Sequence, residues 1–367
     1  MDKTSVFITT SNIGYGTGGG NVCYNICHAL QTFTNLKQIL CHGNTDLAPS
    51  CKNIYPPDYD LPDNPFLYDY IASELVTPFV DIAHFYGNPF GKTVEKIKKY
   101  NPNARIIVDC PAHNLELSIE EHMKLYGSYP YPHMTNPLLW RAYIKHMTKA
   151  NLIITPSKLS RDYIISGKAF TKIFNHRPNI RIIPHGTNLP DEKEIKEYPE
   201  EFTPGYIGQY GPDKGVIYLV SAWVTSQLSE KHKILLAGLS SLQIADKIKN
   251  KFKILGRIEH VSEFYNQISI YIQPSVTEGF GLPVLEAMSY GRPVIVTEGV
   301  GAKDIVTEGY DGFIIPIRNP ELLQKRIQYF YDNPDEIKRM GKNAREKAKN
   351  YTWDTIRERY KDAISKL

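Results

Sequence analysis

The amino-acid sequence predicts an α/β protein in which two Rossmann-like halves, each with a parallel sheet, face a cleft. Short apolar segments that read as buried strands alternate with amphipathic helical segments along most of the chain. This alternation is typical of parallel sheets joined by right-handed crossovers. A length of 367 residues exceeds one ordinary hydrophobic core. The charged, proline-bounded stretch 190–204 reads as a solvated linker, and the strand pattern restarts behind it as a second domain.

The composition is that of an ordinary globular protein, with 42% hydrophobic and 22% charged residues. A formal net charge of +4 is too small to indicate a nucleic-acid partner. The amino terminus lacks the long apolar segment of a signal peptide, and no stretch approaches the roughly 18 apolar residues of a membrane-spanning helix. We therefore expect a cytoplasmic protein that does not bind nucleic acid.

The five cysteines all lie in the first third of the chain, at Cys23, Cys27, Cys41, Cys51 and Cys110. Cys23 and Cys27 would share one face of a helix, which is compatible with metal binding. No second close pair and no cluster of cysteine and histidine completes a four-ligand set. Buried free thiols are the favoured interpretation.

A glycine-rich loop follows the first predicted strand, 5–9, and precedes a helix that reaches about residue 30. Gly14, Gly16 and Gly19 have the G-x-G-x-x-G spacing of dinucleotide-binding proteins, which keeps a nicotinamide (NAD)-dependent oxidoreductase as an alternative. The acidic residue that this fingerprint needs at the end of the next strand is missing. We favour a turn that lets the backbone approach a phosphate or a sugar.

Two further strands of the first half end in polar loops. The segment 87–93 opens a helix but has one residue too few between its glycines for a phosphate-binding P-loop, so we expect Lys92 to be a solvated helix residue. The predicted strand 105–109 leads to His113, at the strand end where parallel sheets collect ligands. His113 is either a ligand-facing residue or a loop histidine bonded to nearby backbone.

The second half contains the most informative stretch, 274–293. A buried strand, 268–272, precedes the glycine loop Glu278-Gly-Phe-Gly281, and a helix then opens with Pro283. A helix amino terminus behind a strand and a glycine loop favours an anion, because unpaired N–H groups and the helix dipole point at it. Glu278 in the loop and Glu286 in the first helical turn flank that positive end. We therefore expect a ligand that is part phosphate and part polyol.

Together these residues resemble a retaining glycosyltransferase of the GT-B fold, most similar to family 4 within the glycosyl transferases group 1. The most specific feature is a Glu-x7-Glu motif formed by Glu278 and Glu286. Supporting matches occur in the same order along the chain as in the family: Gly18-Gly19, His185-Gly186, Leu255-Gly256-Arg257-Ile258 and Tyr351-Thr352-Trp353. The resemblance covers most of the chain and is strongest from about residue 180 onward.

The resemblance implies roles in moving a sugar from a nucleotide-diphosphate sugar to an acceptor. Glu286 would hold the ribose hydroxyls, Glu278 would lie by the donor sugar and Lys214 would neutralise the leaving diphosphate. His113 would lie beside the reacting sugar, so the implied catalytic residues are Glu278, Lys214 and His113. The other implied donor-binding residues are Gly18, Gly19, Gln209, Arg257, Ile258, Gly279, Phe280, Gly281 and Leu282.

The implied chemistry needs no metal ion or other cofactor, because a lysine and a helix amino terminus can stabilise the departing phosphate. One position departs from the family. Gln209 stands where an arginine usually pairs with the diphosphate, five residues before Lys214. Losing such a charge-assisted contact costs on the order of 1–3 kcal/mol of donor binding. A catalytically weak or silent binding protein is therefore a second alternative.

The resemblance also divides the chain into an acceptor domain, 1–189, and a donor domain, 190–349, with a last helix, about 350–367, that packs back on the first. The implied partners are a UDP- or GDP-linked sugar and a glycan, lipid or small-molecule acceptor. The acceptor would be bound by the loops 14–20, 43–65 and 126–137. A lipid acceptor would allow peripheral membrane contact through the basic helix Lys92–Lys99, although a solvated face is the favoured interpretation of its lysines.

Overall fold

The computed structural model describes residues 3–13, 18–42, 52–53, 65–77, 79–87, 90–112, 114–127, 146–166, 178–238 and 245–367. The chain forms two compact units. Unit 1 consists of Met1–Ala112, Pro130–His185 and Trp353–Leu367, and unit 2 consists of His113–Tyr129 and Gly186–Thr352. The chain therefore enters unit 2 twice, once for a short segment and once for most of its second half.

This division differs from the expected domains chiefly in that short segment. The sequence pattern places residues 113–129 in the first domain, whereas their helix, α4 (Leu115–Tyr126), groups with unit 2. The longer segment of unit 2 starts at Gly186 and ends at Thr352, where the expected borders are 190 and 349. The assignment of one domain to the acceptor and the other to the donor stays a prediction.

Unit 1 is built on a parallel sheet of seven strands in the order β3-β2-β1-β4-β5-β6-β7. These strands are β1 (Thr4–Asn12), β2 (Asn35–His42), β3 (Lys52–Asn53), β4 (Ile82–Tyr86), β5 (Arg105–Asp109), β6 (Leu152–Thr155) and β7 (Ile180–Ile182). The strand order reverses direction between β1 and β4, which is the topology of a Rossmann sheet.

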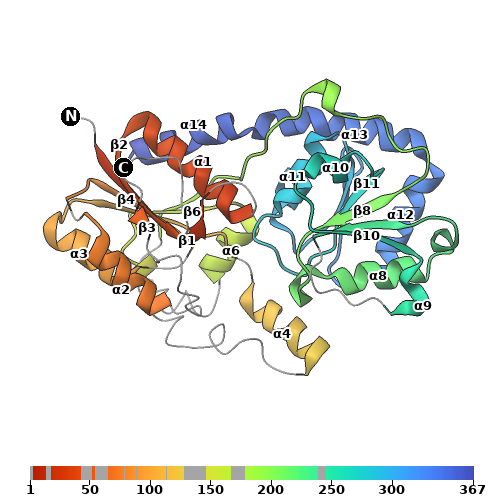
Figure 1. Ribbon diagram of the computed structural model, residues 1–367, viewed down its shortest axis with the longest axis horizontal. Coiled ribbons are helices and arrows are strands. Elements are labelled where there is room, and N and C mark those ends of the chain that lie inside the picture. The colour runs from red at the N-terminus through yellow and green to blue at the C-terminus, as the bar shows by residue number, and fades with distance from the viewer. Residues whose placement is uncertain are drawn as a thin grey trace. The chain divides into compact units, whose positions relative to one another are not determined.

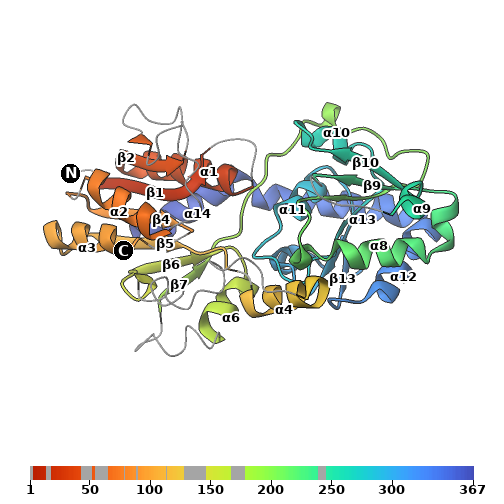
Figure 2. The same cartoon turned by 60° about the horizontal axis from the view of Figure 1, so that its bottom comes forward.

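Helices cover both faces of this sheet (Figures 1 and 2). They are α1 (Gly18–Phe33), α2 (Pro65–Leu75), α3 (Gly91–Tyr100), α6 (Lys158–Ser166) and α14 (Trp353–Ser365). Helices α2 and α3 pack against one another over one face, beside the buried side chains of Phe85 and Phe90. Helix α14, the last of the chain, lies beside α1 on the other face. The carboxyl-terminal segment is therefore an integral part of the amino-terminal unit.

Unit 2 repeats this plan with six parallel strands in the order β10-β9-β8-β11-β12-β13. They are β8 (Pro204–Ile207), β9 (Ile234–Ala237), β10 (Phe252–Gly256), β11 (Ile270–Gln273), β12 (Val294–Thr297) and β13 (Gly312–Ile315). Its helices, besides α4, are α8 (Val216–Val224), α9 (Asp246–Lys249), α10 (Val261–Tyr265), α11 (Leu282–Ser289), α12 (Pro320–Asp332) and α13 (Pro334–Ala348). Short 3-10 helices are η1 (Glu192–Glu194), η2 (Pro212–Lys214), η3 (Gln227–Glu230), η4 (Gly301–Ile305) and η5 (Lys349–Tyr351).

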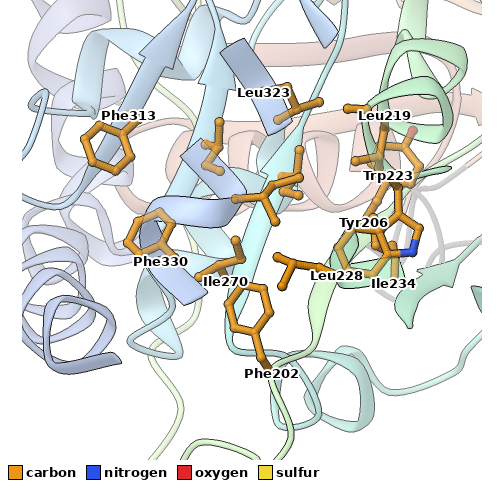
Figure 3. Close-up of a cluster of buried hydrophobic side chains, with 14 of the residues drawn as sticks. Phe202, Tyr206, Leu219, Trp223, Leu228, Ile234, Ile270, Phe313, Leu323 and Phe330 are labelled. Carbon is orange, nitrogen blue, oxygen red and sulfur yellow. The ribbon is translucent and has the colours of Figure 1, made fainter. Parts of the chain in front are cut away.

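The strands of unit 2 are buried almost throughout, as expected for a sheet that helices cover on both sides; only the edge strand β10 has exposed residues, Lys253 and Ile254. Alternate residues of one strand enter different cores: Ile234 and Leu236 join one, and Leu235 joins the other. The first core packs the sheet against α8 and α12, and Figure 3 shows its large side chains, which include Trp223 from α8 and Phe330 from α12. The second core packs the sheet against α10, α11 and η4. The expected fold of two parallel α/β sheets is confirmed.

Cys23, Cys27, Cys41 and Cys110 are buried free thiols, which confirms the favoured interpretation for those four; Cys51 lies outside the described residues. In the part of the chain that the structure describes, no helix combines the length and the apolar character needed to cross a membrane.

Candidate functional site

The two neighbouring central strands of unit 2, β8 and β11, carry the candidate site. The strand order of the sheet reverses between them, and a parallel sheet opens a crevice for ligands at the carboxyl ends of the strands on either side of such a reversal. Lys214 lies in η2, in the loop that follows β8. Glu278 lies in the loop that follows β11. The topology alone therefore brings these two sequence-predicted residues to one edge.

Lys214 and Glu278 form a direct ion pair between Nζ and Oε2. Asp213 adds a second carboxylate, with its Oδ2 3.8 Å from the Lys214 Nζ. Burial alone would lower the pKa of Lys214, but the attraction of Glu278 and Asp213 outweighs it and raises the pKa above its usual value. Lys214 is therefore protonated at neutral pH. Its side chain is 26% exposed, so a ligand can reach the ammonium group.

Backbone hydrogen bonds lock the Lys214 turn to the Glu278 loop. The carbonyl of Asp213 accepts the N–H groups of Val276, at 2.7 Å, and Thr277, at 3.3 Å. Gly215 follows Lys214 with φ +63°, and a Cβ there would lie 2.1 Å from the carbonyl oxygen of Pro274. Only glycine permits this close approach of two backbones. The ion pair is thus held by its two loops and does not depend on flexible side chains alone.

Helix α11 begins directly behind the glycine loop. Its N-cap is Gly281, with φ +93° and no side-chain cap, and Pro283 occupies the first turn. The N–H groups of this turn and the helix dipole point toward the loop, as an anion site requires. The segment after β12 holds this loop in place. Glu278 pairs with Val300 in a β-bridge, and the N–H of Ala302 donates to the Phe280 carbonyl at 2.7 Å.

Glu286 lies in the second turn of α11, not in the first as expected, because the helix begins at Leu282. The hydroxyl of Tyr265, on α10, donates to its Oε2 at 2.8 Å and contacts the Pro283 carbonyl at 3.2 Å. Burial raises the pKa of Glu286, and the hydrogen bond from Tyr265 partly opposes the shift. One carboxylate oxygen of Glu286 is therefore oriented by Tyr265, and the half-buried carboxylate is a candidate acceptor of hydrogen bonds from a hydroxyl-bearing ligand.

The other predicted residues of unit 2 lie at the carboxyl ends of β8 and β10. Gln209 follows β8; its side chain is exposed, and its carbonyl accepts the Tyr206 hydroxyl at 3.1 Å. Arg257 follows β10 and is exposed, whereas Ile258 is half-buried and packs against the second core. Both strands therefore bring their predicted residues to the same sheet edge as Lys214.

The predicted residues of the first half belong to unit 1 or lie outside the described residues. Gly18 and Gly19 are the first two residues of α1. Gly14, Gly16 and His113, and most of the predicted acceptor loops, are among the residues that the structure does not describe. Asn114, the neighbour of His113 in sequence, belongs to unit 2, and its N–H donates to the Thr277 hydroxyl at 2.8 Å.

The lysines of α3 have local partners. Lys96 donates to the Ser73 carbonyl at 2.5 Å, and Lys98 donates to the Ala104 carbonyl at 2.7 Å. Both ammonium groups therefore bind backbone carbonyls of neighbouring segments in unit 1. Lys92 is exposed and stands 4.9 Å from the centre of the Tyr70 ring, as expected of a solvated helix residue.

The site also contains residues that reasoning from sequence missed, namely Asp213, Tyr265 and Thr277. Asp213 could have been found, because it directly precedes Lys214. Tyr265 lies in a different helix from Glu286, and no local pattern links the two. Among the described residues, no group of three or more histidine, cysteine or acidic side chains is arranged to hold a metal ion.

Comparison with known proteins shows which proteins this region of the chain resembles. Residues 189–347, which include Lys214, Glu278 and Glu286, match the family model of the glycosyl transferases group 1. These residues make up less than half of the chain. An uncharacterised glycosyltransferase of Methanocaldococcus jannaschii is 28% identical over 247 residues, which cover 65% of this chain and 66% of the relative. The matched region thus spans just under two thirds of that relative's length.

Solved structures extend the similarity to the whole chain. Sucrose-phosphate synthase from Thermosynechococcus elongatus superimposes with a TM-score of 0.76 over 100% of this chain and 99% of its own, at 18% identity. HepE of Anabaena, solved in complex with UDP-glucose, superimposes with a TM-score of 0.71 over 100% of both chains, at 15% identity. At such low identity the likeness shows the fold alone, and it confirms the expected GT-B fold.

Proposed function

We propose that the protein is a retaining glycosyltransferase that moves a sugar from a nucleotide-diphosphate sugar to an acceptor without a metal ion. The observation that carries the proposal is the ion pair of Lys214 with Glu278, in the loop before α11, the helix that carries the oriented carboxylate of Glu286. The match of this region to the glycosyl transferases group 1 supports it. So does the UDP-glucose complex of the similarly folded HepE.

In the proposed reaction, the bond between the anomeric carbon and the diphosphate oxygen breaks while an acceptor oxygen bonds to the same face of the sugar. The acceptor's proton passes to the departing diphosphate, which leaves with the bonding electron pair. Negative charge therefore grows on the phosphate and positive charge on the sugar ring. Lys214 and the N–H groups of Gly281 and Leu282 stabilise the negative charge on the phosphate. The carboxylate of Glu278 stabilises the positive charge on the sugar ring. No covalent sugar–enzyme intermediate is proposed.

Binding of the donor is assigned to a set of residues around the same sheet edge. Glu286 accepts hydrogen bonds from the ribose hydroxyls, and the backbone at Arg257 and Ile258 contacts the base. Gln209 and the backbone of Gly279 and Phe280 contact the diphosphate and the sugar. Gly18 and Gly19 are also assigned to donor binding, and His113 is assigned to the reacting sugar. The base is that of UDP or GDP, and the acceptor is a glycan, a lipid or a small molecule.

A binding experiment tests this proposal. Thermal shift of the wild-type protein with UDP-glucose, GDP-mannose and ADP-glucose should show stabilisation by at least one, followed by slow release of its nucleotide. Glu286→Ala should lose that stabilisation, whereas Glu298→Ala, a control at an exposed carboxylate of the same unit, should keep it. Identical responses of wild-type protein and Glu286→Ala to every nucleotide sugar would contradict the proposal.

A catalytically silent binding protein is the second candidate, and the uncharged Gln209 favours it. The donor would then bind with no turnover against a broad panel of acceptors. An NAD-dependent oxidoreductase is disfavoured by the family match of unit 2, and it would require NAD binding that Gly16→Val abolishes.

The proposed absence of a metal requirement is tested by chelation. The transferase activity should be the same with and without EDTA.

A further inference from the structure

Helix α4 packs on the carboxyl edge of the unit 2 sheet, although the chain reaches it directly from β5 of unit 1. It contacts η2, the turn that carries Lys214. Asn114 caps the helix, because its side-chain oxygen accepts the Leu117 N–H at 3.0 Å. The backbone N–H of the same residue donates to the hydroxyl of Thr277, which is buried and precedes Glu278. The start of α4 is thus hydrogen-bonded to the loop that carries the candidate catalytic carboxylate.

A polar anchor holds this helix in place. Among the described side chains of α4, Glu121 alone is fully buried, and the others are half-buried or exposed. Its Oε1 lies 2.5 Å from Nε of Arg318, and its Oε2 accepts the Tyr218 hydroxyl at 2.8 Å. A carboxylate is buried at an acceptable energetic cost only when it is paired in this way. The helix is therefore held by an ion pair and a hydrogen bond, and none of its described apolar side chains is fully buried.

The backbone at Arg318 supports a role beyond simple packing. Arg318 is the only residue other than glycine with positive φ, at +58°, among the residues that the structure describes. It lies in the turn that leaves β13, at the carboxyl edge of the sheet. A side chain in this conformation is strained, and such strain persists where the surroundings need that side chain. Here it directs the guanidinium group to Glu121 and, at 2.9 Å, to Glu120.

We propose that Glu121, Arg318 and Thr277 are positioning residues of the donor site, which use α4 to hold the Glu278 loop in its reactive geometry. The inference rests on the proposed glycosyltransferase function. Glu286 and Tyr265 are held by α10 and α11, apart from this anchor. Nucleotide binding and sugar transfer should therefore respond differently when the anchor is removed.

Two variants, Glu121→Ala and Arg318→Gly, test what happens when α4 loses its anchor. Arg318→Gly removes the guanidinium group and also relieves the backbone strain. UDP-glucose hydrolysis, with water as acceptor, should fall about 10- to 100-fold, as misplacement of a catalytic group does. UDP affinity, measured by calorimetry, should stay within about twofold, as for a distant surface change. Amide hydrogen exchange in 115–126 should rise, and the double variant should lose no more than the worse single variant. Glu116→Gln, an exposed change on the same helix, should match the wild type.

The link to Thr277 is tested without disturbing α4. Thr277→Val removes the oxygen that accepts the Asn114 N–H and should lower turnover about tenfold, whereas Thr277→Ser should restore it to within about twofold. Full turnover in Thr277→Val and Glu121→Ala, or an equal loss of UDP affinity and turnover, would overturn the inference. A wild-type protein that binds and hydrolyses no nucleotide sugar would instead overturn the proposed function itself. The two failures are therefore distinguishable.

Discussion

Each unit contains a cluster of charged and hydrogen-bonding groups near the centre of its sheet, and the two clusters differ in exposure. In unit 1, His84 Nε2 and the Tyr360 hydroxyl contact the carboxylate of Asp109 at 2.8 and 3.0 Å, and all three residues are at most 2% exposed. In unit 2, the side chains of Lys214 and Glu278 are 26% and 22% exposed. We call the buried cluster of unit 1 the closed cluster and the partly exposed cluster of unit 2 the open cluster. A closed cluster can join elements of one fold, whereas an open cluster can exchange an internal partner for a ligand.

The closed cluster joins the last helix of the chain to the amino-terminal sheet. Tyr360 lies on α14, while His84 and Asp109 lie on β4 and β5. Burial raises the pKa of Asp109, and its contacts with His84 and Tyr360 partly oppose the shift. The comparison therefore predicts that the closed cluster contributes to stability and the open cluster to catalysis.

Removing the carboxylate of the closed cluster should have the largest effect. Asp109→Ala leaves His84 and Tyr360 without their shared partner in a buried site, so the free energy of unfolding should fall by about 3–5 kcal/mol. Asp109→Asn keeps an acceptor and should cost less, because the raised pKa shows that the buried site disfavours the charge. Urea denaturation measures both. Asp162→Ala, at a surface ion pair in the same unit, should change stability by less than about 1 kcal/mol.

Removing Lys214, the cation of the open cluster, should lower turnover and leave stability nearly unchanged. Lys214→Ala should lower nucleotide-sugar turnover by about 10²- to 10³-fold, because the departing phosphate loses its charged partner. The free energy of unfolding should change by less than about 1 kcal/mol, since the ion pair is partly exposed. Lys231→Ala, an exposed lysine of unit 2, is the control. A large loss of stability with full turnover would reverse the comparison.

Glu286 combines features of both clusters, because it is paired internally and is proposed to bind ribose. Glu286→Gln should weaken UDP binding by about 1.5–3 kcal/mol, through loss of hydrogen bonds to a charged acceptor. Its thermal midpoint at pH 7 should equal or exceed that of the wild type. The raised pKa means that folding disfavours the ionised form, so wild-type stability rises relative to the variant as pH falls through that pKa.

The same pKa determines how donor binding depends on pH. Wild-type affinity for UDP should fall as Glu286 becomes protonated, and the variant should lack this part of the pH dependence. Calorimetric titration with UDP between pH 4 and pH 8, roughly spanning the range on both sides of an ordinary glutamate pKa, measures the difference. A wild-type affinity that stays constant over this range would show that Glu286 does not bind the ribose in its ionised form.

The fold and much of the candidate site could be predicted from sequence because their signals are local. Strand, glycine loop and Pro283 lie in one continuous stretch, and parallel topology then brings the loop of Lys214 to that of Glu278. Tyr265 and Arg318 could not be predicted, because their contacts depend on how separate helices and turns pack. The position of α4 was also beyond the sequence pattern, since its anchor is a single buried carboxylate and its apolar periodicity is that of any amphipathic helix.

The smallest expected effect concerns Gln209, where the open cluster lacks a charge. Gln209→Arg should strengthen UDP binding by about 1–2 kcal/mol, because a guanidinium group can form charge-assisted, bidentate hydrogen bonds to a diphosphate. The UDP affinity of the variant should fall more steeply with salt concentration than that of the wild type, because position 209 is exposed. Gln227→Arg, which places the same charge at an exposed position of unit 2, is the control. If Gln209→Arg raises turnover as well as affinity, the uncharged residue weakens an active enzyme; if affinity rises while turnover stays absent, the silent binding protein is the better description.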